Sequence, residues 1–225
     1  MSENWYGKPR VPQSTSEELE QLLLSKLKRC QDEYCRTLWD LAWLCSHKGR
    51  QERACKYIRK LLAVADDLEL TAACYLALGQ FMEQTRDYDA ACTYYAQAYA
   101  LEPVDPHIAY FVHNNLGYCL NRLGRHEEAE SYLRMAIQID PSRQNAYKNL
   151  GISLESQQRF AEAAECYLQG IQADASDSRA LWLLEELVSD HPEIAQCIPD
   201  LFLQLERCRA AVQAARFGSL TETNP

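Results

Sequence analysis

The residues of this chain that could bind a metal or perform catalysis are its cysteines, histidines and glutamates. Ten cysteines are present, but no two of them form a Cys-x-x-Cys pair. Residues 126–130 begin like the His-Glu-x-x-His motif of zinc proteases, yet Glu130 stands in place of the second histidine. Cys45, His47 and Cys55 could be combined on paper, but their spacing matches no zinc-ligand pattern. We therefore expect no metal site.

Other catalytic signals are also missing from the sequence. It contains no glycine-rich loop for phosphate and no Gly-x-Ser-x-Gly motif for a serine nucleophile. Cysteines such as Cys74, Cys92 and Cys119 fall where a small apolar side chain would pack inside a helical protein. We expect reduced thiols, no cofactor and no enzymatic activity.

Composition limits the classes of partner. The 225 residues carry a formal net charge of −9, whereas phosphate binding requires clustered lysine and arginine, so we expect no nucleic-acid partner. No stretch approaches the roughly 18–20 apolar residues of a membrane span. The opening residues also lack the uninterrupted apolar segment of a secretory signal. The sequence thus predicts a cytoplasmic protein without a membrane span.

An internal repeat in the sequence predicts the fold. An apolar residue and a small one recur together, and the small one precedes an alanine by twelve positions each time. The pairs are Leu41-Ala42, Leu78-Gly79, Leu116-Gly117 and Leu150-Gly151, and the alanines are Ala54, Ala91, Ala129 and Ala163. A fixed period of this kind is typical of stacked helical hairpins. We therefore expect an all-α fold.

Glycines have two roles in this interpretation. Gly79, Gly117 and Gly151 fall in the middle of helices, where glycine costs about 1 kcal/mol relative to alanine. Their recurrence predicts that the missing Cβ lets two helices approach closely. Gly49 and Gly124 fall between the two helices of a hairpin, where a left-handed conformation ends a helix.

The repeat period divides the chain into segments. We expect a flexible arm at 1–15, an N-terminal helix at 16–34 that covers the end of the stack, a degenerate first repeat at 35–68, a second repeat at 72–105, a third at 106–143 with an extended first helix, a fourth at 144–177, a partial repeat with C-terminal capping helices at 178–217, and a disordered tail at 218–225. The apolar stripe from Ile194 to Val212 is interpreted as a cap, because terminal repeats need a modified outer face. Its heptad-like spacing leaves a dimer seam as the alternative.

These residues resemble the tetratricopeptide repeat family, whose pattern begins Trp-x2-Leu-Gly-x2-Tyr and continues with Ala-x3-Phe and Pro. The third repeat supplies His113, Leu116, Gly117, Leu120, Ala129, Leu133, Ala136 and Pro141 at these places. The first repeat departs from the pattern, with Ala42 for the glycine and Asp66 for the proline. The resemblance covers roughly 35–177 and implies a right-handed α-α superhelix, a solenoid with extra capping helices at both ends.

The resemblance also implies which side chains face a concave surface, because the family uses fixed positions of each first helix. The candidates for a partner-binding groove are Trp39, Trp43, Phe111, Asn114, Asn115, Tyr118, Arg122, Asn145, Lys148, Asn149, Arg179 and Trp182. Large aromatic side chains are enriched at binding hot spots. The alternative is that Trp39 and Trp43 pack under the N-terminal helix and that Trp182 packs under the last helix.

Asn115 and Asn149 occupy the same first-helix position in neighbouring repeats. In the family this amide can hydrogen-bond an extended peptide, since it both donates and accepts, although asparagine is also simply frequent there. Neither residue is expected in the core, so replacing both with alanine should weaken binding and leave unfolding unchanged. Family members that clamp a chaperone's terminal carboxylate use further residues that this chain lacks, so we do not expect that clamp.

The function expected from these observations is a non-catalytic protein–protein interaction module that binds a peptide or helix of a partner protein in its concave groove. Two alternatives stay open. One is a chaperone-like holder of a secretion or assembly client. The other is a self-assembling structural protein, or a homodimer, that associates through its terminal helices.

Overall fold

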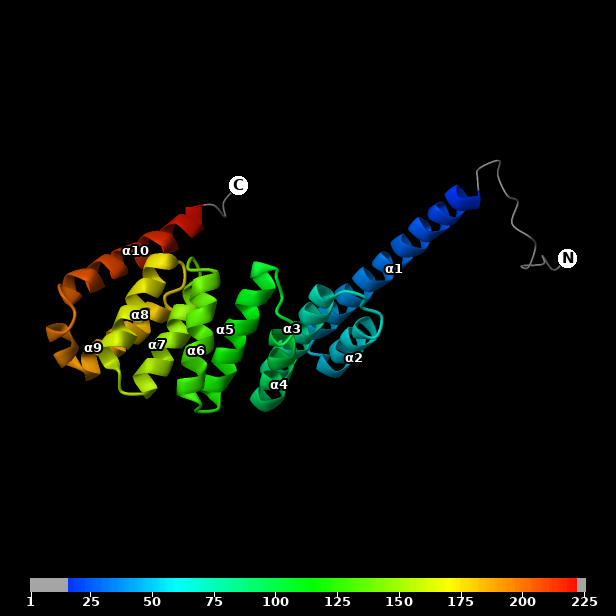
Figure 1. Cartoon of the computed structure of the whole chain (residues 1–225). Helices are drawn as coiled ribbons and strands as arrows, with labels where there is room; N and C mark the ends of the chain where they lie inside the picture. The colour runs from blue at the N-terminus through cyan, green and yellow to red at the C-terminus, as the bar shows by residue number, and fades with distance from the viewer. Residues whose placement is uncertain (1–15, 222–225) are drawn as a thin grey trace. The chain divides into compact units, whose positions relative to one another are not determined.

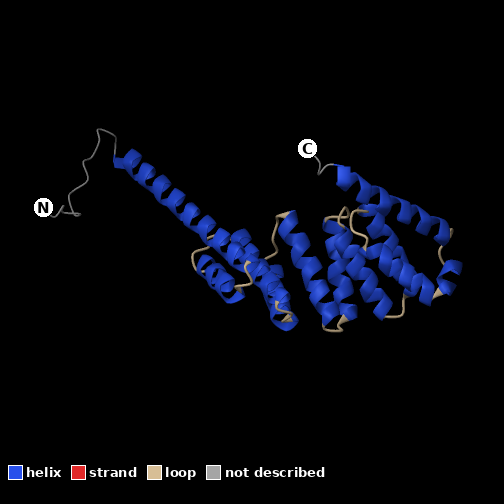
Figure 2. Ribbon diagram, turned by 180° about the vertical axis from the view of Figure 1, so that it is seen from behind, coloured by secondary structure: helices blue, strands red, loops and turns tan. Residues whose placement is uncertain are grey.

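The computed structural model describes residues 16–221, and every regular element in that range is a helix. Figure 1 shows the order of the helices and Figure 2 shows the same elements from behind. The all-α fold predicted from the repeat period is confirmed. The chain divides into two compact units, Met1–Val64 and Ala65–Pro225, which are described separately. The arm predicted for 1–15 and the end of the predicted tail, 222–225, lie outside the described residues.

The first unit is a hairpin of two helices, α1 (Ser16–His47) and α2 (Gln51–Leu62). Gly49 lies in the turn between them with a φ of +68°, a left-handed conformation that glycine adopts without strain. The buried side chains of this unit are small or aliphatic and include Leu38, Ala42, Ala54, Ile58 and Leu61.

Helix α1 differs from the sequence-based prediction. A separate helix was expected at 16–34, but Ser16–His47 is continuous, because no glycine or proline interrupts it. The apolar side chains of its N-terminal part, Leu22, Leu23, Leu24, Leu27 and Tyr34, are 50% to 65% exposed.

The second unit contains the remaining hairpins. Its helices are α3 (Leu68–Gln84), α4 (Tyr88–Tyr99), α5 (Pro106–Arg122), α6 (His126–Ile139), α7 (Gln144–Ser156), α8 (Phe160–Ala173), α9 (Arg179–Asp190), the short 3-10 helix η1 (Pro192–Gln196) and α10 (Leu201–Thr221). Helix α5 begins at Pro106 and has seventeen residues, as does α3, whereas α7 has thirteen. A longer first helix is therefore shared by the second and third repeats.

Aspartates fix the starts of three of these helices. The carboxylate of Asp67 accepts a hydrogen bond from the Leu70 backbone N–H at 2.7 Å, and Asp87 accepts one from Ala90 at 3.1 Å. Asp105 accepts from the Ile108 backbone at 3.1 Å. Each bond satisfies a donor that the first turn leaves without an intrahelical partner. The hairpin boundaries are thus encoded locally.

First helices of successive repeats lie beside one another. Helix α5 packs against both α3 and α7, and α7 also packs against α9. In Figure 1, α5 to α9 follow one another side by side as successive hairpins. The first helices α3, α5, α7 and α9 therefore form one face of the second unit, and this face carries most of the candidate binding residues.

The mid-helix glycines allow the two helices of each hairpin to touch. A Cβ built on Gly79 would lie 2.4 Å from Cε1 of Tyr95, and one on Gly151 would lie 2.2 Å from Cε1 of Tyr167. At Gly117 the nearest atom would be Cγ of Leu133, at 2.5 Å. No side chain fits at these separations, so the prediction of close helix approach is confirmed.

The contacts at Gly79 and Gly151 each include a hydrogen bond from the tyrosine, and in both cases the two bonded residues are twelve apart in the sequence. The Tyr95 hydroxyl donates to Oε2 of Glu83 at 2.9 Å, and the Tyr167 hydroxyl donates to Oε2 of Glu155 at 2.9 Å. Both tyrosines are fully buried. Each tyrosine ring packs over the mid-helix glycine of the preceding first helix, and its hydroxyl donates to a carboxylate of that same helix. The second and fourth repeats thus share one packing solution, whereas the third uses Leu133.

The C-terminal helix closes the second unit. Helix α10 packs on α8 and α9, and Ile194, Ile198, Leu201, Leu205, Cys208 and Val212 are all buried there. These residues are already covered within one chain, so the capping interpretation holds and a dimer seam along the same stripe does not. Helix α10 continues to Thr221, into the segment that was predicted as a disordered tail from residue 218.

The cysteines are free thiols throughout the described chain. Cys55, Cys74, Cys119, Cys166 and Cys208 are buried. Burial raises the pKa of the Cys166 thiol to about 11, so it stays protonated at neutral pH. These side chains fill core positions, as their sequence positions indicated.

Candidate partner-binding groove

The face formed by the first helices of the second unit contains a groove of about 490 Å³. Helices α5, α7 and α9 supply most of its walls. Its lining residues are Glu83, Phe111, Asn114, Asn115, Tyr118, Asn145, Lys148, Asn149, Ile152, Arg179, Trp182 and Leu183. A volume of this size lies within the range of sites that hold a ligand or a few peptide side chains.

Helical periodicity explains why these side chains face the groove. On α5, Phe111, Asn115 and Tyr118 are separated by four and three residues and therefore share one side of the helix. The opposite side of α5 carries Leu116 and Leu120, which are buried in the core. The same division repeats on α7, so one first helix both builds the stack and lines the groove.

The structure places all the candidate residues in this groove except Trp39, Trp43 and Arg122. The Arg122 guanidinium lies beside it, 5.3 Å from the ring centre of Tyr88, and that ring in turn meets Tyr118 edge-on.

Trp39 and Trp43 belong to the first unit and are half-buried on α1, with ring centroids 6.2 Å apart. They cannot pack under a separate N-terminal helix, because that segment is part of α1 itself. Trp182 does not pack under the last helix either, since it is 59% exposed. Packing inside the protein therefore does not fully account for the presence of tryptophan at positions 39, 43 and 182.

A chain of amide hydrogen bonds crosses the groove floor. Nδ2 of Asn149 donates to Oδ1 of Asn114 at 3.1 Å, and Nδ2 of Asn114 donates to Oδ1 of Asn115 at 2.9 Å. Nδ2 of Asn115 then donates to the Tyr95 hydroxyl at 3.5 Å, which itself donates to Glu83. The network joins α7, α5, α4 and α3, so the floor is held in one arrangement before any partner arrives.

The candidate set lacked two residues of this network, Glu83 and Tyr95. Glu83 lies on the first helix α3, whereas Tyr95 comes from a second helix, α4, and the candidates all lie on first helices. The signal of this pair in the sequence is the spacing shared by Glu83 and Tyr95 and by Glu155 and Tyr167, twelve residues in both cases. Burial raises the pKa of Glu83, and the hydrogen bond from Tyr95 opposes that rise.

Asn149 is more buried than the sequence indicated, with only 6% of its surface exposed. The expectation that Asn149 lies outside the core is therefore wrong. Asn149→Ala would leave Oδ1 of the buried Asn114 without its donor, so we predict a loss of about 1–3 kcal/mol in the free energy of unfolding. Urea denaturation checks this, with the exposed Gln138→Ala on α6 as the control. Equal midpoints for the two variants would contradict it.

The cationic end of the groove combines Lys148 and Arg179. Lys148 is only 8% exposed, and its Nζ donates to Oδ1 of Asn145 at 3.1 Å. Arg179 is exposed and pairs with Asp177. Burial lowers the pKa of the Lys148 amine, Arg179 lowers it further, and Asp177 opposes the shift. The groove thus holds a cation whose charge is incompletely compensated.

The lowered pKa of Lys148 has a consequence for stability. At pH values between the lowered pKa of Lys148 in the folded chain and about 10.4, the usual pKa of lysine, the Lys148 amine binds more protons in the unfolded chain than in the folded chain. The contribution of Lys148 to the free energy of unfolding therefore rises with pH across this interval. We predict that Lys148→Met flattens the rise, measured by urea denaturation at several alkaline pH values. The exposed Lys56→Met should leave the profile unchanged, and equal profiles for both variants would contradict the prediction.

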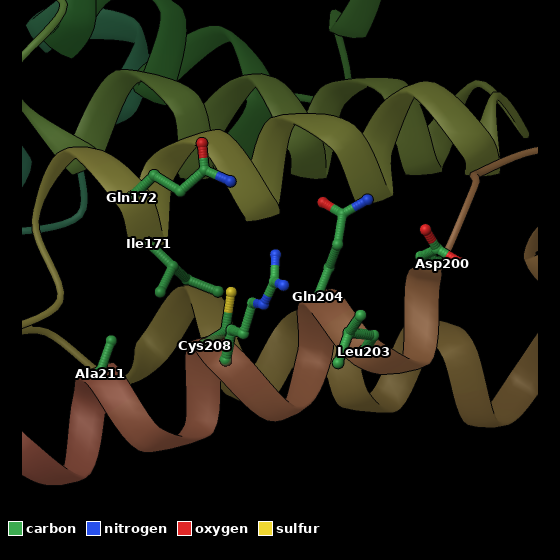
Figure 3. Close-up of a pocket in the computed structure, with 8 residues that line it drawn as sticks. Ile171, Gln172, Asp200, Leu203, Gln204, Cys208 and Ala211 are labelled. Carbon is green, nitrogen blue, oxygen red and sulfur yellow. The ribbon is translucent and has the colours of Figure 1, made fainter.

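A second hollow, of about 420 Å³, lies between α8 and α10 (Figure 3). It is lined by Ile171, Gln172, Asp200, Leu203, Gln204, Arg207, Cys208 and Ala211. It contains no aromatic side chain, and it lies where the terminal helix packs against the stack. We regard it as a gap in the packing of the cap rather than as the main binding site.

The described residues offer no alternative site for metal chemistry. Within 16–221 no three residues among His, Cys, Asp and Glu gather closely enough to hold a metal ion, and Cys45, His47 and Cys55 are no exception. The helices described here also include none that is both long and apolar enough to cross a membrane.

Known tetratricopeptide repeat proteins share part of this sequence. A small glutamine-rich tetratricopeptide repeat-containing protein 2 from Mycosarcoma maydis is 35% identical over 101 residues, which are 45% of this chain and 28% of that protein. Tetratricopeptide repeat protein 7B from Homo sapiens is 33% identical over 98 residues, 44% of this chain and 11% of that protein. The chain therefore spans less than a third of either relative.

Solved structures share the fold. PilF of Pseudomonas aeruginosa has a TM-score of 0.64 at 20% identity, covering 82% of this chain and 78% of the other. MamA of Desulfovibrio magneticus RS-1 has a TM-score of 0.61 at 16% identity, covering 79% and 96%. YrrB, described as a TPR protein with an unusual peptide-binding site, has a TM-score of 0.57 at 18% identity, covering 81% and 90%.

The family itself is evident from three segments. Residues 36–67, 72–105 and 109–176 each match the tetratricopeptide repeat, and together they make up more than half of the chain. Within these segments the repeated alanines Ala54, Ala91, Ala129 and Ala163 are buried in the second helices of the hairpins, α2, α4, α6 and α8. The chain therefore belongs to the tetratricopeptide repeat family.

Proposed function

We propose that this chain is a non-catalytic protein–protein interaction module and that it holds a peptide segment of its partner in the groove of the second unit. The observation that carries the proposal is Trp182, a large aromatic side chain that is 59% exposed beside a preorganised polar floor. Exposed tryptophans are costly in water and are enriched among residues that dominate binding energy. The peptide-binding site described for YrrB, which has the same fold, is consistent with this use.

The chemistry of the groove selects the kind of peptide. Phe111, Tyr118 and Trp182 offer apolar surface for a hydrophobic side chain. Lys148 and Arg179 lie in the same groove and provide positive charge. A carboxylate near Nζ of Lys148 would compensate a buried cation that now relies on an amide oxygen and on Asp177. We therefore expect a partner segment that carries both an apolar and an acidic side chain.

Amides complete the recognition. Asn145 is exposed at the edge of the groove, and Asn115 is half-buried on its floor. An asparagine amide can donate to a peptide carbonyl and accept from a peptide N–H, so it can hold an extended backbone without reading its sequence. Because the floor amides are fixed by their own hydrogen bonds, little ordering is needed when a peptide binds.

The experiment is a peptide selection against the full chain, followed by a double-mutant cycle. Selected peptides should contain an acidic residue, and changing it to its amide should weaken binding to the wild-type chain. The same change should have little effect on binding to Lys148→Met, because the interaction is already lost. In the control Lys56→Met, the change should weaken binding as in the wild type. Equal losses in Lys148→Met and Lys56→Met would contradict the proposal.

A further inference from the structure

The N-terminal half of α1 exposes an apolar stripe that no described part of the chain covers. Leu23, Leu27, Cys30 and Tyr34 are separated by four, three and four residues, which is the spacing of core positions in a two-helix coiled coil. All four are exposed, and Leu27 is 65% exposed. The stripe extends over about three turns of helix.

This stripe lies N-terminal to the part of α1 that is buried within the chain. The buried residues of α1 are Leu38, Ala42 and Ser46, which follow one another at intervals of four. Leu38 comes about one turn after Tyr34, the last residue of the stripe, so the two sets occupy different lengths of the helix. A second helix can therefore lie along the stripe without displacing the buried side of the hairpin.

We propose that the stripe is the interface of a homodimer, in which α1 packs antiparallel against α1 of a second copy. In this register Leu23 lies opposite Tyr34 of the second copy, and Leu27 lies opposite Cys30. The two-fold axis falls between residues 28 and 29, so each contact occurs twice, as in an isologous interface. The two pairs of facing residues each occur twice, so they form four layers of contact across the interface, and all four layers are apolar.

Charge selects this arrangement over the parallel one. Lys26 and Glu33 are seven residues apart, and both flank the stripe on the same edge. In the antiparallel register each Lys26 lies beside Glu33 of the second copy, which gives two ion pairs across the interface. A parallel pair would set Lys26 beside Gln31 and Glu33 beside Leu38, with no ion pair. The helix dipoles also favour antiparallel packing.

Sedimentation velocity of the full chain over a range of concentrations tests the interface itself. The wild type should dimerise, and Leu27→Gln should abolish the dimer because a polar amide replaces the central apolar contact. Leu203→Gln on α10 is the matched control, since Leu203 is 51% exposed and lies elsewhere. Both substitutions keep good helix formers, so circular dichroism should be unchanged. A monomer at all concentrations, or equal behaviour of the two variants, would overturn the proposal.

A charge exchange tests the register. Lys26→Glu and Glu33→Lys should each weaken dimerisation by about tenfold, because two attractive contacts become repulsive. The double variant should return to within about twofold of the wild type, since the pairs are restored with their signs exchanged. Failure of the double variant to recover would overturn the antiparallel register. Dimerisation that persists in Leu27→Gln would instead point to another surface, and peptide binding in the groove can be measured separately in that variant.

Discussion

Replacing Trp182 with alanine is expected to weaken peptide binding by about thirtyfold, which corresponds to about 2 kcal/mol. The side chain offers the largest exposed apolar surface in the groove and lies at its α9 wall, next to Leu183. Because Trp182 is 59% exposed, its removal should change the free energy of unfolding by no more than about 0.5 kcal/mol. Isothermal titration with a selected peptide measures the first quantity, and urea denaturation measures the second.

Phe202→Ala is the matched control for this prediction. Phe202 is 61% exposed on α10 and does not line the groove. Its removal takes away a similar area of aromatic surface without touching the proposed site, so peptide affinity should stay within about twofold of the wild type. If both variants lost affinity equally, exposed aromatic surface in general would be responsible, and the groove would not be the binding site.

Replacing Gly151 with alanine should destabilise the second unit strongly. The new Cβ would lie 2.2 Å from Cε1 of Tyr167, a fully buried ring that is also hydrogen-bonded to Glu155. The ring cannot move aside without losing both its packing and that bond. Overpacking of this kind costs about 1–3 kcal/mol, which outweighs the gain in helix propensity from glycine to alanine.

Gly170→Ala on α8 is the matched control, which separates the steric clash of the new Cβ from the gain in helix propensity. There the new Cβ would lie 3.1 Å from Cβ of Tyr147, so its surroundings need to shift by only a few tenths of an ångström. The propensity gain is the same at both sites. Thermal and urea unfolding should therefore show Gly151→Ala as less stable than Gly170→Ala by about 1–3 kcal/mol. Equal stability would mean that the glycine is not required for the close approach of α7 and α8.

The repeat made the hairpin stack predictable from sequence alone. Gly79, Gly117 and Gly151 are tolerated mid-helix only where another helix comes close, and the side chains that they face, such as Tyr95 and Tyr167, fall at a fixed distance along the chain. Most candidate residues meet in one groove for the same reason, because helical periodicity and the repeat together determine which side of a first helix faces outward.

Other features depend on neighbours that a local pattern does not reveal. No residue pattern within 16–47 marks where the cover by α2 ends, so the sequence does not join the predicted helix at 16–34 to the first helix of the hairpin. Asn149 and Lys148 occupy outward positions by periodicity, yet both are buried. Asn149 donates a hydrogen bond to Asn114 of α5, and Lys148 donates one to Asn145, one turn earlier on α7. The burial of these two side chains depends on side-chain length and on the spacing of adjacent helices, and the repeat pattern indicates neither.

Nuclear magnetic resonance of the full chain, titrated with a selected acidic peptide, tests the central claim most directly. The account predicts that the indole N–H signal of Trp182 and the side-chain amide signals of Asn115 and Asn145 shift together and saturate at one affinity. Shifts confined to residues such as Leu203 and Cys208, in the hollow between α8 and α10, would contradict it.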